Sequence, residues 1–253
     1  MIIDKARAFA ALHVPGKPLI LFNAWDAGSA RVVAEAGAAA IATGSWSVAA
    51  AHGLFDAEAL PLDLALANAT RIVAAVELPV TIDFEGGYAV DPGALAAHAA
   101  ALAATGAIGC NFEDQVIGAA AKMLHPIDAQ AKRIAAMRAA AGPGFFINAR
   151  TDIFLQAPAD SHDRAMADAA IDRAHAYADA GASGFFVPGL VELSLLERVC
   201  RASPLPVNFM AFPGAPSAAH IAATGIARIS HGPGPYRLAM KALADAARVA
   251  LAG

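Results

Sequence analysis

The chain has 253 residues, of which 58% are hydrophobic and only 16% charged, and its formal net charge is −4. This acidic balance provides no basic surface and argues against a nucleic-acid partner. No apolar run reaches the roughly 18 residues that a membrane-spanning helix needs. The first residues, MIIDKARAFAALH, lack the order of a signal peptide, so we expect a soluble, cytoplasmic protein.

Eight short apolar segments follow one another along the chain, separated by stretches long enough for helices. In four of them an Ala-rich helical end meets a glycine, which suits a left-handed helix C-cap, and then a strand. The strands are apolar throughout, as expected when both faces of a parallel sheet are buried. In chain order the segments are PLILFNA (18–24), VVAEAGAAAIATG (32–44), PVTIDFE (79–85), LAATGAIGCNFED (102–114), GFFINAR (144–150), AYADAGASGFFVPG (176–189), PVNFMA (206–211) and HIAATGIARIS (220–230).

Eight strand–helix units in about 250 residues predict an α/β fold of the closed (β/α)8 barrel type. An open doubly wound sheet is the alternative, although no GxGxxG follows the first strand. The last segment, PYRLAMKALADAARVALAG (235–253), is predicted as one helix. We find no linker or second domain, and therefore expect one barrel domain over residues 1–253.

Polar side chains gather where these apolar strands end. In the third strand Thr81, Asp83 and Glu85 share one face by alternation. Burying two carboxylates against the surrounding helices would be very costly, so we expect both to face the barrel axis at its carboxyl mouth, where such barrels hold their active sites. Other strand ends carry Asn23, Thr43, Gly44, Ser45, Asn111, Glu113, Asn148, Arg150 and Asn208.

Three carboxylates meeting at one mouth predict a metal site. Asp83, Glu85 and Glu113 would raise one another's pKa values, and a divalent cation relieves that repulsion. Oxygen ligands without His or Cys favour Mg²⁺ or Mn²⁺ over Zn²⁺. The alternative is a hydrogen-bonded polar plug without a metal.

Two further features suit a small anionic substrate. Arg150 offers a planar fork for a carboxylate or a phosphonate, unless it forms a structural ion pair with Glu113 or Asp152. The backbone N–H groups around Thr43, Gly44 and Ser45 are candidate oxyanion donors. Together with a metal, these groups describe a site for an oxo acid that passes through an enolate.

The motifs in this order resemble those of the isocitrate lyase/phosphoenolpyruvate mutase superfamily. The resemblance spans about residues 18–215 and is carried by NAWDAGSARVVAEAGAAAIATGSWSVAAAHGLFD, LPVTIDFEGGY, GCNFED, INARTD and GFFVPGL. It implies a Mg²⁺-binding (β/α)8 barrel that makes or breaks a C–C or P–C bond next to a 2-oxo acid. By position it assigns the metal site to Asp83, Glu85 and Glu113, substrate binding to Arg150 and Thr43–Ser45, and a catalytic role to Asp56. Arg150 is also a catalytic candidate, and Asn208 is a candidate substrate contact because of its place in the seventh strand. A loop or helix cap is the alternative role for Asp56, and structural hydrogen bonding is the alternative for Asn208.

One loop departs from the family pattern. Isocitrate and methylisocitrate lyases carry a catalytic Cys after the fourth strand, whereas QVIGAAAKMLHPID (115–128) has none. Lys122 and His125 are the candidates for a replacement proton carrier in this loop.

The resulting hypothesis is a Mg²⁺-dependent lyase or decarboxylase acting on a 2-oxo or hydroxy (di)carboxylate. The alternatives are P–C bond chemistry on a phosphonopyruvate-like substrate and a non-catalytic barrel. The family also exchanges its last helix between subunits and assembles as a dimer of dimers. That assembly would suit helix 235–253 and the low charge content, because obligate interfaces resemble a core cut in half.

Overall fold

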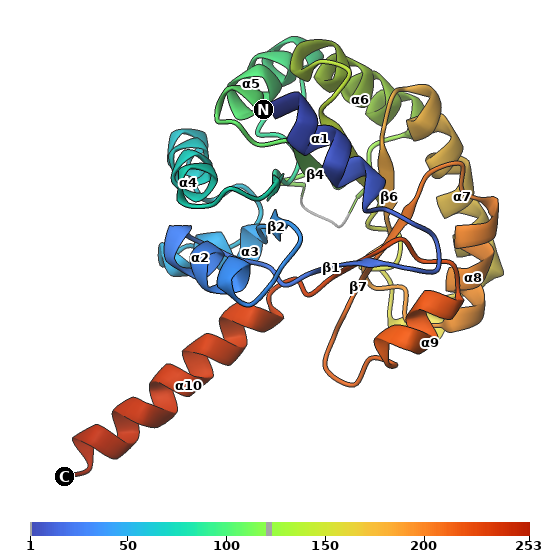
Figure 1. Ribbon diagram of the computed structural model, residues 1–253. Coiled ribbons are helices and arrows are strands. Elements are labelled where there is room, and N and C mark those ends of the chain that lie inside the picture. Colours follow the sequence, from blue (N-terminus) through green and yellow to red (C-terminus); the bar gives the residue numbers. More distant parts are fainter. Residues whose placement is uncertain (1, 120–122) are drawn as a thin grey trace.

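Eight parallel strands form one barrel-shaped sheet in a computed structural model that describes residues 2–119 and 123–253 (Figure 1). Its order is β1-β8-β7-β6-β5-β4-β3-β2, and a bridge between Ala24 and Thr43 joins the remaining edges, β1 and β2. The predicted (β/α)8 barrel is therefore confirmed, and the open sheet is excluded. The strands are β1 (Leu19–Leu21), β2 (Ile41–Ala42), β3 (Val80–Asp83), β4 (Gly109–Glu113), β5 (Phe146–Arg150), β6 (Gly184–Phe186), β7 (Val207–Met210) and β8 (Arg228–Ser230).

Helices follow the strands and cover the outside of the barrel (Figure 1). Asp26, Asp91 and Asp163 each cap a helix by accepting hydrogen bonds from backbone N–H groups of its first turn. The four glycines predicted as C-caps all have left-handed backbone, with φ between 89° and 97°. The helices are α1 (Ile2–Ala11), α2 (Ala27–Glu35), α3 (Ser45–Ala51), α4 (Leu62–Ala75), α5 (Pro92–Ala104), α6 (Ile127–Ala141), α7 (Arg164–Asp179), α8 (Leu193–Ala202), α9 (Ala218–Ala223) and α10 (Gly234–Leu251), with a 3-10 turn at Ala159–Ser161.

The main hydrophobic core lies between the outer face of the sheet and the helices. Ile147, Phe185 and Phe209 are fully or almost fully buried there. Because all strands run parallel, their carboxyl ends meet at one rim, and the register places Asp83 beside Asn111 and Glu113 beside Arg150. The polar residues at the strand ends therefore lie together at a single site.

The last helix leaves the barrel instead of covering it. Figure 1 shows α10 projecting away from the sheet, and Leu238, Leu243 and Val249 on it are 64%, 63% and 78% exposed. Among the described residues, none of the helices has both the length and the apolar character needed to cross a membrane.

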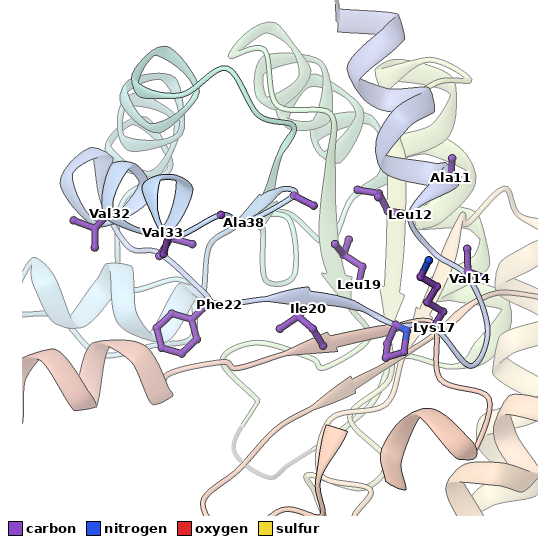
Figure 2. A pocket seen from close by; sticks show the side chains of 14 residues that line it. Ala11, Leu12, Val14, Lys17, Leu19, Ile20, Phe22, Val32, Val33 and Ala38 are labelled. Atoms are coloured by element: carbon purple, nitrogen blue, oxygen red, sulfur yellow. The ribbon is translucent and has the colours of Figure 1, made fainter. Parts of the chain in front are cut away.

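An apolar groove of about 640 Å³ lies on the outside of the barrel beside β1 and α2. Figure 2 shows Ile20 of β1, Phe22 directly after it and Val33 of α2 among its lining residues. Ile20 and Phe22 are 43% and 41% exposed, although the outer face of a barrel strand is normally covered by a helix. This groove and α10 are therefore two apolar surfaces of the same chain that lack a cover.

Candidate active site at the carboxyl ends of the strands

The carboxyl ends of the strands enclose a cavity of about 160 Å³. One part of its wall is polar and combines acids, amides, hydroxyls and a guanidinium, while the other part is apolar. The polar lining residues are Asn23, Ser45, Asp56, Asp83, Asn111, Arg150 and Ser230, and the others are Gly44, Trp46, Leu155, Phe186, Pro188, Met210, Gly232 and Pro233. Such a mixture suits a small, negatively charged molecule that also has an apolar part.

Asp83, the last residue of β3, is held by the loop that follows β2. Its Oδ2 accepts a hydrogen bond from the Ser45 N–H at 2.9 Å, and its own N–H donates to Thr43 Oγ1 at 2.8 Å. Thr43 N–H in turn donates to Thr81 O. Two N–H groups predicted as oxyanion donors thus bind protein oxygen atoms, and the 43–45 loop fixes Asp83 in the cavity wall.

Glu85 does not follow the strand alternation that the sequence suggested. The strand ends at Asp83, and Glu85 has a left-handed φ of 49°, so it lies in a turn. Its carboxylate accepts from the Glu58 N–H at 2.6 Å and from the Tyr88 hydroxyl at 3.4 Å. It lines a small void next to Asp83 rather than the main cavity. Burial, followed by Asp56 and the other acids nearby, raises the pKa of Glu85 to about 8.

Glu58 locks the loop after α3 onto the turn after β3. Its Oε1 accepts from the Tyr88 N–H at 2.8 Å, while its N–H donates to Glu85. Ala57, Glu58, Glu85 and Tyr88 all have left-handed backbone, which is strained for residues with side chains. Glu58 is not among the predicted site residues, because no local motif indicates a contact between loops 27 residues apart.

Glu113 and Arg150 pair across neighbouring strands. Arg150 Nη1 lies 2.7 Å from Glu113 Oε2, while its Nε and Nη2 contact both oxygens of Asp152 at 2.6 and 2.9 Å. Burial alone would lower the pKa of Arg150, but Asp152 and Glu113 raise it above its ordinary value. The ion pair considered from sequence is present with both acids, and Arg150 still lines the cavity.

Asp114, directly after Glu113, points the other way. It is fully buried and accepts from Arg173 Nη1 at 2.9 Å and from the Tyr177 hydroxyl at 2.8 Å, both on α7. Strand alternation thus separates the two acids of the NFED motif: Glu113 pairs with Arg150 at the mouth, and Asp114 joins the strand to the helix layer.

Asp56 reaches the cavity from the exposed loop after α3. Loss of water around its carboxylate, followed by the nearby charge of Asp83, raises its pKa, and a hydrogen bond with the Ser45 side chain opposes that rise. An acid with a raised pKa beside a hydroxyl can hold a proton at the cavity wall.

The remaining predicted site residues are not brought into the cavity lining. Asn208 is buried beneath it, where its Oδ1 accepts from the Ser230 hydroxyl at 3.0 Å. His125 is buried at the base of the segment after β4, in which Val116 N–H donates to Met123 O and His125 N–H to Asp114 O. Lys122 lies outside the described residues. Asn111, in the middle of β4, and Ser230, the last residue of β8, do line the cavity. For Ser230, its place at a strand end is the signal that points to it.

The acids around Asp83 fit a hard divalent cation in their chemistry. They offer oxygen ligands only, and burial, followed by the nearby acids Asp56 and Asp83, raises the pKa of Glu85. Within the described part of the chain no three His, Cys, Asp or Glu side chains converge in a ready-made ion cage. Because Mg²⁺ keeps several of its water ligands, acids spaced in this way suit contact partly through water.

The chain matches known proteins over nearly its whole length. A sequence model of the phosphoenolpyruvate phosphomutase family matches residues 9–251. An uncharacterized protein of Mycobacterium tuberculosis is 36% identical over 242 residues, which are 95% of this chain and 88% of that protein. The 2-methylisocitrate lyase of Salmonella typhimurium is 32% identical over 209 residues, 79% of this chain and 68% of the relative. A crystal structure from Burkholderia cenocepacia J2315 is 50% identical, with a TM-score of 0.94 and coverage of 100% of both chains.

These likenesses cover the strand ends that build the cavity as well as the barrel around it. The chain therefore belongs to the isocitrate lyase/phosphoenolpyruvate mutase superfamily, whose members are lyases and mutases that act on carboxylate substrates.

Proposed function

We propose that this protein is a Mg²⁺-dependent lyase that cleaves a C–C bond next to a 2-oxo or 2-hydroxy (di)carboxylate through an enolate intermediate. The observation that carries the proposal is the cavity itself, in which Asp83, Asp56 and Arg150 meet at the carboxyl end of the barrel. The 2-methylisocitrate lyase relative supports C–C rather than other bond chemistry.

The residues divide the work by their chemistry. Asp83, Glu85 and Glu113 would hold Mg²⁺, in part through water, and the bound ion would stabilise negative charge that develops on substrate oxygen atoms. Arg150 is the one cation among the described lining residues, and it orients a substrate carboxylate. Burial raises the pKa of Asp56, although its hydrogen bond with Ser45 opposes that rise, and Asp56 exchanges a proton with the substrate. The apolar wall, which includes Leu155 and Phe186, limits access of water to the reacting carbon.

The substrate is a small anion, and its identity is open to a direct screen. Malates, isocitrates and their alkylated forms are incubated with the protein and Mg²⁺, and release of pyruvate or glyoxylate is detected. We expect one of them to be cleaved and 5 mM EDTA to abolish turnover. Turnover that persists in metal-free protein would contradict the metal-dependent mechanism.

P–C bond chemistry on a phosphonopyruvate-like substrate is the second candidate, because the matching family model is that of a phosphomutase. Phosphorus NMR separates the two, since a mutase or hydrolase changes the phosphonate signal and a C–C lyase leaves it unchanged. The scarcity of cations in the cavity supports a carboxylate rather than a phosphonate substrate. Arg150 is already paired with Glu113 and Asp152, which leaves little positive charge for a phosphonate dianion.

We also propose a homo-oligomer, assembled as a dimer of dimers, in which α10 of one copy covers the groove of another. The groove is apolar and beside β1, and the uncovered side chains of α10 are Leu or Val (Figures 1 and 2). Charged residues of α10 instead pair with one another, as Lys241 and Arg248 do with Asp245. Together these features supply complementary surfaces for a second copy.

Light scattering after size exclusion tests this assembly. We expect the full chain to be tetrameric, and Leu243→Asp together with Phe22→Asp to lower the mass. Asp168→Asn, in a partly exposed ion pair between α7 and Arg198 of α8, serves as the control. A monomeric full chain would overturn the proposed assembly and leave the proposed reaction unaffected.

A further inference from the structure

Arg228 is a buried cation that the proposed reaction does not use. It begins β8, is fully buried, and is among the largest of the fully buried side chains. It lies two residues before Ser230 and therefore on the same face of the strand, one layer beneath the cavity. Its Nη2 donates to Asn111 Oδ1 at 3.1 Å, while its Nε and Nη1 have no hydrogen-bond partner among the described residues.

Such an arrangement costs stability. A buried charge needs an opposite charge and a full set of hydrogen bonds, and replacing incompletely compensated buried ions by apolar residues is often neutral or stabilising. Burial lowers the pKa of Arg228 to about 9, and Asp83 opposes that change. A role in folding alone therefore does not explain an arginine at this place.

The contact with Arg228 fixes the orientation of the Asn111 side-chain amide. Asn111 Oδ1 accepts both from Arg228 and from Asn148 Nδ2, the latter at 2.9 Å. Two donors at one atom identify it as the carbonyl oxygen, so the amide nitrogen must face the other way. There Asn111 Nδ2 donates to Asp83 Oδ1 at 3.4 Å.

A glycine in β6, the strand next to Asn148, makes room for this network. A Cβ at position 184 would lie 2.8 Å from Asn148 Oδ1, closer than real Cβ contacts allow. Gly184 therefore leaves the space in which Asn148 reaches Asn111. The network thus connects four strands: β8 through Arg228, β5 through Asn148, β4 through Asn111 and β3 through Asp83.

We propose that Arg228 is a positioning residue that acts through Asn111. Its guanidinium fixes the Asn111 amide toward Asp83 and places positive charge beneath the acids of the cavity. This inference rests on the proposed function, because it concerns how the cavity receives an anionic oxo acid. Arg228 itself is not among the residues that line the cavity and does not touch the substrate.

The test compares two arginines. Arg228→Met is expected to keep or raise the melting temperature of metal-free protein and to weaken oxalate binding, at saturating Mg²⁺, by about 10-fold or more. Arg138→Met is the matched control, because all contacts of Arg138 lie at the opposite end of the barrel. It should lower the melting temperature and leave oxalate affinity unchanged. Calorimetric titration and scanning calorimetry give both quantities.

Two more variants test the route through Asn111. Arg228→Lys keeps the charge and should recover part of the lost affinity. In a double-mutant cycle with Asn111→Leu, the double variant should bind oxalate no more weakly than Asn111→Leu alone, because the two residues act as a unit. Additive losses would contradict this route.

The outcomes separate this inference from the proposed function. Wild-type protein that fails to bind oxalate with Mg²⁺ would overturn both. Wild-type binding with unchanged affinity in Arg228→Met would overturn only the role of Arg228. Failure of Arg228→Met to fold would also contradict it, since a structural role would then explain the residue.

Discussion

The two ends of the barrel are built on opposite principles. At the carboxyl end, Asp56, Asp83 and Glu85 repel one another, and Glu85 needs a pH near 8 to ionise. All four non-glycine residues with left-handed backbone in the described part of the chain lie in the loops after α3 and β3 at this end. Strain and crowded charge lower the free energy of unfolding, so this end is shaped by something other than stability.

At the amino end, the hydrogen-bond donors of the Arg138 guanidinium have protein partners. Arg138 Nη1 donates to Gly142 O and Phe145 O at 2.7 and 2.6 Å, Nε to Gly181 O at 2.9 Å, and Nη2 to Ser183 Oγ at 2.8 Å. These groups directly precede β5 and β6, so one side chain ties two loops to a helix. The amino end of the barrel thus contributes stability and the carboxyl end accommodates chemistry, as in other barrels of this type.

Replacing an acid at the carboxyl end should produce the largest effect. Asp83→Asn keeps the shape but removes a charge from the cavity, and we expect turnover to fall by about 1,000-fold. The melting temperature should hold or rise, because repulsion with Asp56 and Glu85 is relieved. Steady-state kinetics and scanning calorimetry measure the two effects, with Asp168→Asn on the surface as the control. Lost stability with intact turnover would reverse the proposed division.

A change at the amino end should do the opposite. Arg138→Met removes donors from three carbonyls and a hydroxyl that are then left without partners, and we expect a loss of about 3 kcal/mol in the free energy of unfolding. Turnover per folded molecule should not change. Urea unfolding combined with kinetics below the transition provides the check. A fall in turnover at unchanged stability would show that the two ends are not separate.

The smallest expected effect is a change of stability with pH at the carboxyl end. The pKa of Glu85 is about 8 in the folded protein and 4.5 ordinarily, so the folded state binds more protons between these values. Stability conferred by the protonated form is therefore lost as pH rises from 4.5 to 8 and stays constant above 8. From pH 6.5 to 8 this loss amounts to at most about 2 kcal/mol.

Metal-free protein gives the measurement. The melting temperature of the wild type should fall from pH 6.5 to 8, while Glu85→Gln, which cannot ionise, should show a shallower slope. Identical slopes would mean that Glu85 ionises normally and that the carboxyl end is less crowded than its contacts indicate.

The barrel could be predicted from the sequence because its signals are local. A glycine after an Ala-rich segment marks the end of a helix, and an uninterrupted apolar run marks a strand buried on both faces. Both signals recur along the chain and need no knowledge of distant residues. Asp83 and Arg150 were predictable for the same reason, since each ends an apolar strand.

Parts of the site depend on contacts that no local pattern contains. The strand alternation that predicted Glu85 fails because β3 ends at Asp83 and the chain turns there. The turn is held from outside by Arg133, which donates to the carbonyls of Gly86 and Ala89, and by Glu58. This turn directs the Glu85 side chain away from the predicted position, although Glu85 still lies next to Asp83 as predicted.

The role of Arg228 could not be predicted from the residues around it in the sequence. In HIAATGIARIS it stands inside an apolar run, where an arginine suggests a strand edge rather than the barrel interior. Its role emerges only when Asn111, more than a hundred residues earlier, is found beside it. Networks that cross the barrel axis are therefore the part of such a site that sequence reasoning misses most easily.

The short contact between β1 and β2 involves residues that face the cavity and residues that face the outer groove. These edges meet at the Ala24–Thr43 bridge, supported by Asn23 Nδ2 bonded to Thr43 O at 2.7 Å. Thr43 holds Asp83 on the inner side, while β1 and Ala39, just before β2, line the outer groove. A breathing motion that parts this seam would loosen the grip on Asp83 and widen the groove together. A surface that fills the groove would therefore pack directly against the strand join whose Thr43 holds Asp83.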